Sequence, residues 1–242
     1  MKIPIKITPC PIIEAIVEIR FDSKLPHDAI FGIIYQAFKK DYPKYEKFPI
    51  LQLPEAIRSQ DKNLIYKPYY KIFNDILTFN IGPKVISLSV VSDDSREYIG
   101  WKNFSLKLQE WLQKMRYLEI IEYITRLGIR YINYFDLDVY SKINLSILLK
   151  EQPLNSKELL IKTLLQTGDF LSTLQIANNA KVQVGGKFKN GSVIDVDTFL
   201  NLEKQELSDD FFDLIESGHM EEKKLFFSLL NTVFLEQLNP KY

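Results

Sequence analysis

The chain has 242 residues, of which 46% are hydrophobic and 13% aromatic, and its 31 basic residues equal its 31 acidic residues. The high apolar content excludes an intrinsically disordered chain. The zero net charge argues against a protein that coats DNA or RNA, because such binding draws its energy from many neutralised phosphates. The length suits one large domain or two closely packed halves.

The chain holds a single cysteine, Cys10, which can form no internal disulfide and is typical of a protein from a reducing compartment. No apolar run reaches the roughly 18 residues that a membrane-spanning helix needs. The apolar start is interrupted by prolines and by Glu14, and no cleavage site for a signal peptide follows. These features predict a cytoplasmic protein that makes no contact with membranes.

The first half of the sequence alternates between strand and helix patterns. Apolar residues alternate with polar ones from Ile13 to Phe21, as in a half-buried strand, and a helix of about 14 residues is expected after Pro26. A second helix is expected over 101–115. The other expected strands are 64–73, 76–81, 85–91 and 120–136, with an edge strand or loop over 48–54. In the longest strand the odd-numbered residues from Tyr123 to Asn133 are expected to share one side, and Gly128 predicts a bulge or a close approach.

The second half predicts another run of antiparallel strands, over residues 159–166, 170–177, 181–189 and 192–199. Asn190-Gly191 is the strongest hairpin signal in the chain, because both central residues of the favoured turn adopt positive φ. A short helix is expected over 143–149. Two helices are expected to close the chain, with a break at Ser217-Gly218, so that His219 lies near an exposed helix start.

These patterns predict the α+β fold class, with antiparallel β-meanders and helices packed on one face. We expect an N-terminal half over residues 1–140 and a C-terminal half over residues 141–242, packed together as one compact unit. Residues 136–140 (Asp-Leu-Asp-Val-Tyr) resemble residues 195–199 (Asp-Val-Asp-Thr-Phe), which suggests that the two halves are pseudo-repeats.

Asp195 and Asp197 are the strongest candidates for a metal site. Residues two apart in a strand share a face, so the pair could offer oxygens to a divalent cation such as Mg²⁺. Asp136 and Asp138 form a similar pair. The alternative is that these carboxylates solvate the polar side of a strand, which an antiparallel sheet with one wet face requires in any case.

Basic and aromatic residues interleave at 66–71 and at 130–135, and on an exposed sheet they would stack bases and neutralise phosphates. Packing of these aromatics in the core is the favoured alternative, because Tyr and Phe are common strand residues. Gly185-Gly186-Lys187 lacks the spacing of a P-loop and fits a bulge and hairpin better than a phosphate cradle. The candidate ligand or partner contacts are Arg130, Tyr131, Asn133 and Lys187, with Arg130 or Lys187 holding an anion.

No motif of a nucleophilic, zinc or dinucleotide-binding enzyme occurs, and the only histidines are His27 and His219. We therefore expect no cofactor and favour a non-enzymatic protein that binds a macromolecular partner. A protein partner is favoured over nucleic acid, and a homo-oligomer is left open. Two alternatives are kept: a small-ligand or nucleotide-binding domain, and a Mg²⁺-dependent nuclease or phosphodiesterase that uses the aspartate pairs.

Residues 11–21 (Pro-Ile-Ile-Glu-Ala-Ile-Val-Glu-Ile-Arg-Phe), Gly100-Trp101 and residues 128–133 (Gly-Ile-Arg-Tyr-Ile-Asn) resemble a sporadically distributed, uncharacterised family of bacterial and archaeal proteins. The resemblance covers nearly the whole chain. It implies an accessory gene carried on mobile or defence-type loci, and the partner-binding protein expected above would then be an accessory or antitoxin-like regulator. It supplies no catalytic residue.

Overall fold

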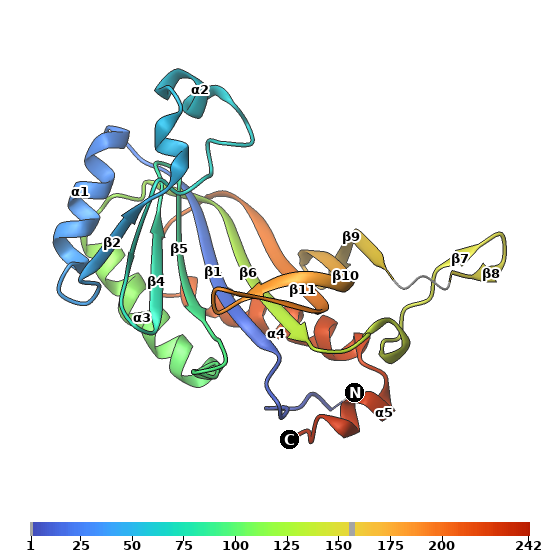
Figure 1. The fold of residues 1–242 in the computed structure, drawn as a ribbon. Helices are drawn as coiled ribbons and strands as arrows, with labels where there is room; N and C mark the ends of the chain where they lie inside the picture. Colours follow the sequence, from blue (N-terminus) through green and yellow to red (C-terminus); the bar gives the residue numbers. More distant parts are fainter. Residues whose placement is uncertain (1, 155–157) are drawn as a thin grey trace.

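The computed structural model describes residues 2–154 and 158–242. Within these residues nine strands form one antiparallel sheet in the order β2-β3-β4-β5-β1-β6-β11-β10-β9 (Figure 1). The strands are β1 (Ile12–Asp22), β2 (Lys44–Lys47), β3 (Tyr70–Phe73), β4 (Leu77–Ile81), β5 (Val85–Val91), β6 (Tyr123–Phe135), β9 (Leu159–Thr167), β10 (Phe170–Val184) and β11 (Lys187–Gln205). Two short strands, β7 (Leu148–Leu149) and β8 (Gln152–Pro153), pair with each other outside this sheet.

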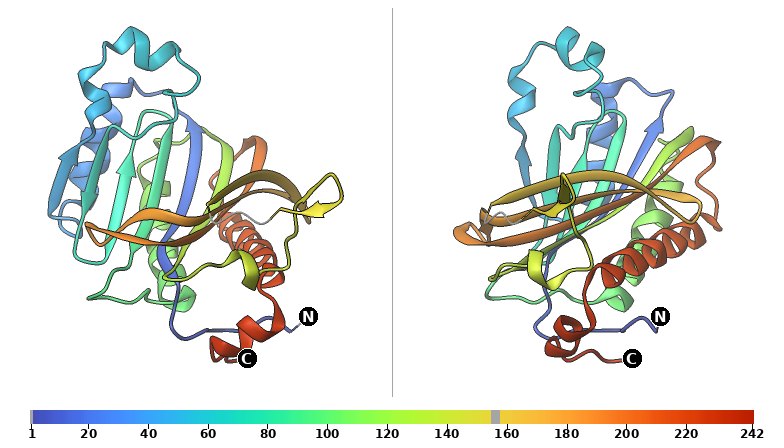
Figure 2. Two further views of the ribbon diagram at one scale, coloured as in Figure 1. Left: turned by 45° about the vertical axis from the view of Figure 1, so that its right-hand side comes forward. Right: turned by 90° about the vertical axis from the view of Figure 1, so that its right-hand side faces the viewer.

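The longer helices lie on one face of the sheet, as the two views of Figure 2 show. The helices are α1 (His27–Phe38), α2 (Glu55–Gln60), α3 (Trp101–Tyr117), α4 (Phe211–Leu229) and α5 (Thr232–Gln237), with the 3-10 helices η1 (Pro49–Gln52) and η2 (Tyr140–Lys142). Among the described residues no helix has both the length and the apolar character needed to cross a membrane.

The alternation of β1 explains this layering. Its odd-numbered residues Ala15, Val17, Ile19 and Phe21 are fully buried and pack with apolar residues of α1 and α3 and with the start of α4. A second apolar cluster joins β6, β10 and β11 to the C-terminal part of α4 and to α5. The predicted α+β class with antiparallel strands is confirmed.

Strand β6 joins the two expected halves in one sheet. One of its edges pairs with β1, so that Glu18 lies opposite Gly128, and the other pairs with β11, so that Arg130 lies opposite Asp197. The expected N-terminal and C-terminal halves therefore contribute strands to the same sheet. A pseudo-repeat of the two halves stays a prediction.

The predicted hairpin turn at Asn190-Gly191 is wrong. Strands β10 and β11 turn at Gly185-Gly186 instead, where φ is 56° and 80°. Gly191 lies inside β11, and a Cβ there would come within 2.4 Å of the carbonyl oxygen of Phe135, so this glycine permits a close strand contact. At Asn178-Asn179 the chain bulges and continues in β10, so the predicted strand break there is also wrong.

The long β10–β11 hairpin curves across the face of the sheet that carries no helix (Figures 1 and 2). Its tip reaches the segment that follows β5. There Lys189 forms an ion pair with Asp94, and Gly185 packs against the side chain of Asp93. The tip is therefore tied to the opposite half of the sheet.

The predicted helix break at Ser217-Gly218 is wrong, because α4 runs through it. Gly218 is buried against the sheet, where a Cβ would lie 2.5 Å from Ile129 Cδ1, so glycine here permits the close approach of helix and strand. The break comes later, at Asn231, whose side chain accepts a hydrogen bond from a backbone N–H of α5. His219 consequently lies in the middle of a helix and is only 6% exposed, contrary to the prediction.

Three further segments differ from their predicted forms. Residues 143–149 form no helix, because Ile143 forms a β-bridge with Leu230 and β7 ends the segment. Residues 48–54 contain η1, which begins at Pro49. The strand expected over 64–73 begins only at Tyr70, because residues 61–67 form successive turns. No prediction had been made for β2 or α2.

Candidate functional site

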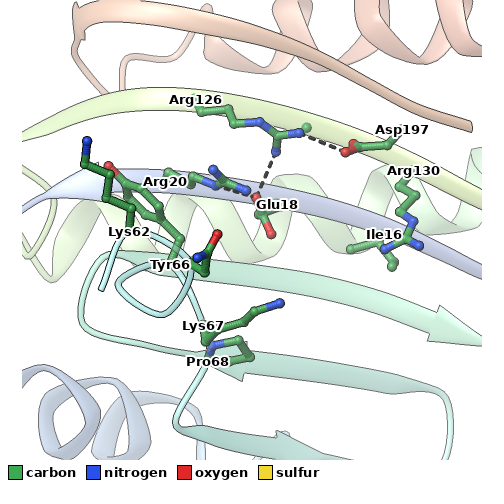
Figure 3. A pocket seen from close by; sticks show the side chains of 12 residues that line it. Ile16, Glu18, Arg20, Lys62, Tyr66, Lys67, Pro68, Arg126, Arg130 and Asp197 are labelled. Carbon is green, nitrogen blue, oxygen red and sulfur yellow. Dashed lines mark hydrogen bonds and ion pairs between the residues drawn. The ribbon is translucent and has the colours of Figure 1, made fainter. Parts of the chain in front are cut away.

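A polar groove of about 410 Å³ lies on the face of the sheet that carries no helix (Figure 3). Strands β1, β6 and β11 form its floor, and the segment between α2 and β3 forms one wall. The lining residues are Ile16, Glu18, Arg20, Lys62, Asn63, Tyr66, Lys67, Pro68, Arg126, Gly128, Arg130 and Asp197. Basic residues outnumber acidic ones in this set.

Strand alternation brings the charged residues of the floor together. Glu18 and Arg20 of β1 face the groove because their odd-numbered neighbours are buried under the helices. Arg126 and Arg130 of β6 face it for the same reason. A register shift between β1 and β6 lies on the N-terminal side of Arg126 in β6. Because of this shift, Tyr123 and Thr125 do not lie on the buried side of β6. The prediction that the odd-numbered residues of this strand share one side is therefore confirmed only from 127 to 133.

A chain of ion pairs crosses the floor. Glu18 Oε1 accepts from Arg20 Nε and from Arg126 Nη1, each at 2.8 Å, and Arg126 Nη2 donates to Asp197 Oδ2 at 2.9 Å (Figure 3). The Arg126 side chain is 10% exposed, and its Cζ lies 4.4 Å from the centre of the Phe199 ring. Charge-assisted hydrogen bonds and the aromatic contact therefore hold this guanidinium in one position.

Gly128 makes room for this network. A Cβ at this position would lie 2.5 Å from Arg126 Nη1 and 3.4 Å from Asp197 Oδ1. The close approach predicted at Gly128 is confirmed, and the bulge that was its alternative lies elsewhere in β6.

Arg130 occupies the other end of the floor. Its Nε donates to Asp195 Oδ1 at 2.8 Å and its Nη2 to Asp195 Oδ2 at 2.6 Å, a bidentate pair that raises the pKa of Arg130 above its ordinary value. The Arg130 side chain is 43% exposed, and its Nη1 has no acceptor among the described residues. One edge of this guanidinium is therefore available to an outside acceptor.

The wall of the groove carries two exposed lysines, Lys62 and Lys67, that form no ion pair with any residue the structure describes. The turn that contains Lys62 is fixed by Asp61, whose side chain accepts a hydrogen bond from the backbone N–H of Asn63 at 2.7 Å. The Arg20 guanidinium lies over the ring of Tyr66, with 4.7 Å between Cζ and the ring centre. These contacts hold the wall next to the floor.

The electrostatic balance of the groove favours anions. Burial raises the pKa of Asp197 above its ordinary value, although Arg126 acts in the opposite direction. Burial also raises the pKa of Glu14, which lies near enough to Arg130 and Asp195 to interact with both. The raised pKa values of Asp197 and Glu14 weaken the anionic character of these two carboxyl groups beside the arginines.

The structure brings only some of the predicted site residues together. Arg130, Asp195 and Asp197 lie at the groove. Tyr131 and Asn133 lie on the opposite face of β6, where both are buried and border a separate cavity. Lys187 is exposed at the β10–β11 turn and lines neither the groove nor that cavity.

The two aspartates proposed as metal ligands share a face, as predicted, but each meets a guanidinium group: Asp195 meets Arg130 and Asp197 meets Arg126. Across residues 2–154 and 158–242 no group of three or more His, Cys, Asp or Glu side chains could hold a metal ion. Magnesium binding by this pair stays a prediction.

Sequence reasoning missed Arg126 and Lys62 as site residues, and it considered Lys67 only as part of the interleaved basic and aromatic segment 66–71. A signal for Arg126 was present, because the alternation that buries Leu127 and Ile129 also puts 126, 128 and 130 on the opposite face. No local signal marks Lys62, which reaches the groove only because the 61–68 segment folds over the sheet.

Comparison of the chain with protein-family models and with curated protein sequences finds no match.

Proposed function

We propose that this protein binds a macromolecular partner and that the groove on the open face of the sheet receives an acidic peptide segment of that partner. The observation that carries the proposal is the pair of exposed, unpaired lysines, Lys62 and Lys67, facing arginines that are already fixed in position. Acidic side chains can bind to such preorganised donors with little further ordering of the protein.

The floor favours a peptide over a nucleic acid. Glu18, Asp195 and Asp197 lie among the arginines as hydrogen-bond acceptors, and a phosphodiester backbone offers no N–H donor to them. A peptide instead offers backbone N–H groups to carboxylate oxygens and carboxylates to the cations. The exposed Nη1 edge of Arg130 and the two lysines suit a segment with more than one acidic residue.

The test uses labelled octaglutamate, octaglutamine and an oligothymidine of matched length, with binding followed by fluorescence anisotropy. We expect octaglutamate to bind, octaglutamine not to bind, and affinity to fall with added salt. The double variant Lys62→Glu/Lys67→Glu is expected to weaken octaglutamate binding at least about tenfold. Lys39→Glu/Lys40→Glu, at the exposed end of α1, makes the same change in net charge and is expected to have little effect.

Equal octaglutamate binding by the two double variants would remove the groove as the site. Tighter binding of oligothymidine than of octaglutamate would replace the peptide with a nucleic acid. Both variants change exposed side chains without ion-pair partners among the described residues, so both are expected to fold.

A further inference from the structure

A second cavity, of about 640 Å³, lies on the helix side of the sheet. The N-terminal segment, the start of α3, strand β6 and α4 surround it. Its volume falls in the range of roughly 300–1,000 Å³ that is typical of small-molecule sites. Apolar side chains supply much of the wall, among them Ile7, Pro11, Ile12, Ile99, Phe226 and Phe227.

Glu222 is one of the polar residues that line this cavity, where the charged residues Lys6, Lys102, Glu216 and Lys223 also contribute to the lining. Glu222 is 4% exposed and forms no hydrogen bond or ion pair with any described residue. Burial raises its pKa well above the ordinary value, which favours the protonated, uncharged form of the carboxyl group. A buried polar group without a partner is rare in folded proteins and calls for an explanation, such as a ligand that completes its hydrogen bonds.

His219 lies one helical turn before Glu222 and is held on the cavity wall. Its ring stacks on Trp101 with 3.8 Å between ring centres, and its Nδ1 has no hydrogen-bond partner among the described residues. Trp101 is fixed in turn, because its Nε1 donates to both carboxylate oxygens of Glu216, at 3.0 and 3.1 Å. Burial and the neighbouring Lys223 lower the pKa of His219 to about 3, so the imidazole is uncharged.

We propose that this cavity binds an uncharged small molecule with an apolar body and a single hydrogen-bonding end, and that Glu222 receives that end beside His219. A protonated carboxyl group offers one donor and one acceptor, which matches the donor and acceptor of a primary amide. The apolar wall suits an aliphatic or aromatic body. Burial disfavours the charged forms of this acid and this imidazole, so neither side chain supplies a counter-charge at the end of the ligand that it would contact.

The cavity lies on the opposite face of the sheet from the groove, so this inference is independent of the proposed function. Tyr131 and Asn133, two of the three predicted contacts that the groove does not include, border it.

The test titrates three probes that share an octyl chain, octanamide, octylammonium and octanoate, into the intact protein by calorimetry at neutral pH. We expect octanamide to bind at least about tenfold more tightly than either charged probe. Glu222→Leu is expected to weaken octanamide binding about tenfold, whereas Glu222→Gln, which keeps one donor and one acceptor, is expected to change it by less than about threefold. Glu236→Leu, at an exposed position of α5, is the matched control.

Tighter binding of octylammonium or of octanoate than of octanamide would make this a site for a charged ligand and overturn the proposal, as would equal octanamide affinity in Glu222→Leu and wild type. Absence of heat with all three probes would also overturn it. The groove variant Lys62→Glu/Lys67→Glu is expected to bind octanamide like wild type, which separates this result from the peptide test. If Glu222→Leu fails to fold, the probe series on wild type and on Glu222→Gln still decides the matter.

Discussion

The guanidinium of Arg126 lies over Gly128, at the place that a side chain on residue 128 would fill. A Cβ on residue 128 would stand 2.5 Å from Arg126 Nη1, the atom that donates to Glu18. The glycine is therefore part of the ion-pair network, although it contributes no polar atom.

Gly128→Ala is expected to displace the Arg126 guanidinium and weaken its pairing with Asp197, lowering the free energy of unfolding by about 1–2 kcal/mol. Urea denaturation measures the change. Gly32→Ala is the control, because nothing lies within 4 Å of a Cβ at that position in α1, and alanine there is expected to stabilise the protein by up to about 1 kcal/mol. Equal effects of the two substitutions would contradict this account.

Gly218→Ala is expected to lower the free energy of unfolding by about 1–3 kcal/mol, because its Cβ would overlap Ile129 Cδ1. Ile129→Val removes that methyl group and alone costs about 0.5–1.5 kcal/mol. The double variant should lose clearly less stability than the sum of the two single variants. A thermodynamic cycle by chemical denaturation tests this, and simple additivity would show that the contact is unimportant.

Glu222→Gln is expected to stabilise the protein at neutral pH. The raised pKa of Glu222 means that the folded state holds its proton above the ordinary value of 4.5, so wild-type stability is greatest below that pH and is lost as pH rises toward the folded pKa. The loss is about 1.4 kcal/mol for each unit by which the pKa is raised. Denaturation of both proteins across pH should show curves that converge in acid and separate toward neutral pH. Parallel curves would indicate an ordinary pKa.

His219 is expected to destabilise the fold in acid. Its folded pKa of about 3 lies below the ordinary 6.5, so the unfolded chain takes up a proton first, and stability is lost as pH falls from 6.5 toward 3. The slope from this group is at most about 1.4 kcal/mol per pH unit. His219→Phe, which keeps a ring on Trp101, should remove that part of the acid loss, whereas His27→Gln at an exposed position should leave it unchanged. If the free energy of unfolding of His219→Phe falls in acid as steeply as that of the wild type, another group is responsible.

Local sequence patterns predicted the elements in which the buried apolar residues recur at one regular spacing. Strand β1 and helices α1 and α3 each bury one regular face, so alternation or helical spacing was sufficient to find them. Two of the errors arose where glycine serves a distant contact. Gly191 meets Phe135 of β6, and Gly218 meets Ile129, and neither neighbour can be inferred from the adjacent sequence.

The same limit applies to the sites. Alternation in β6 already implied that Arg130 and Tyr131 face opposite sides of the sheet, although both were predicted to contact the same ligand or partner. The stripe of Phe211, Ile215, His219 and Phe226 also fits one continuous helix, once Gly218 is taken as a packing residue. The approach of Lys62 and Lys67 to the floor depends on tertiary folding and has no local signature.

The strand order has a consequence for synthesis. The neighbours of β6 come from nearly opposite ends of the chain, since β1 begins at Ile12 and β11 ends at Gln205. While the ribosome is still translating, β6 can pair with β1 but keeps an unpaired edge until most of the polypeptide has emerged. Exposed edges of this kind invite association with other nascent chains, and distant pairing is slow. Completion of the sheet, and with it of the groove and the cavity, therefore waits until β11 has been synthesised.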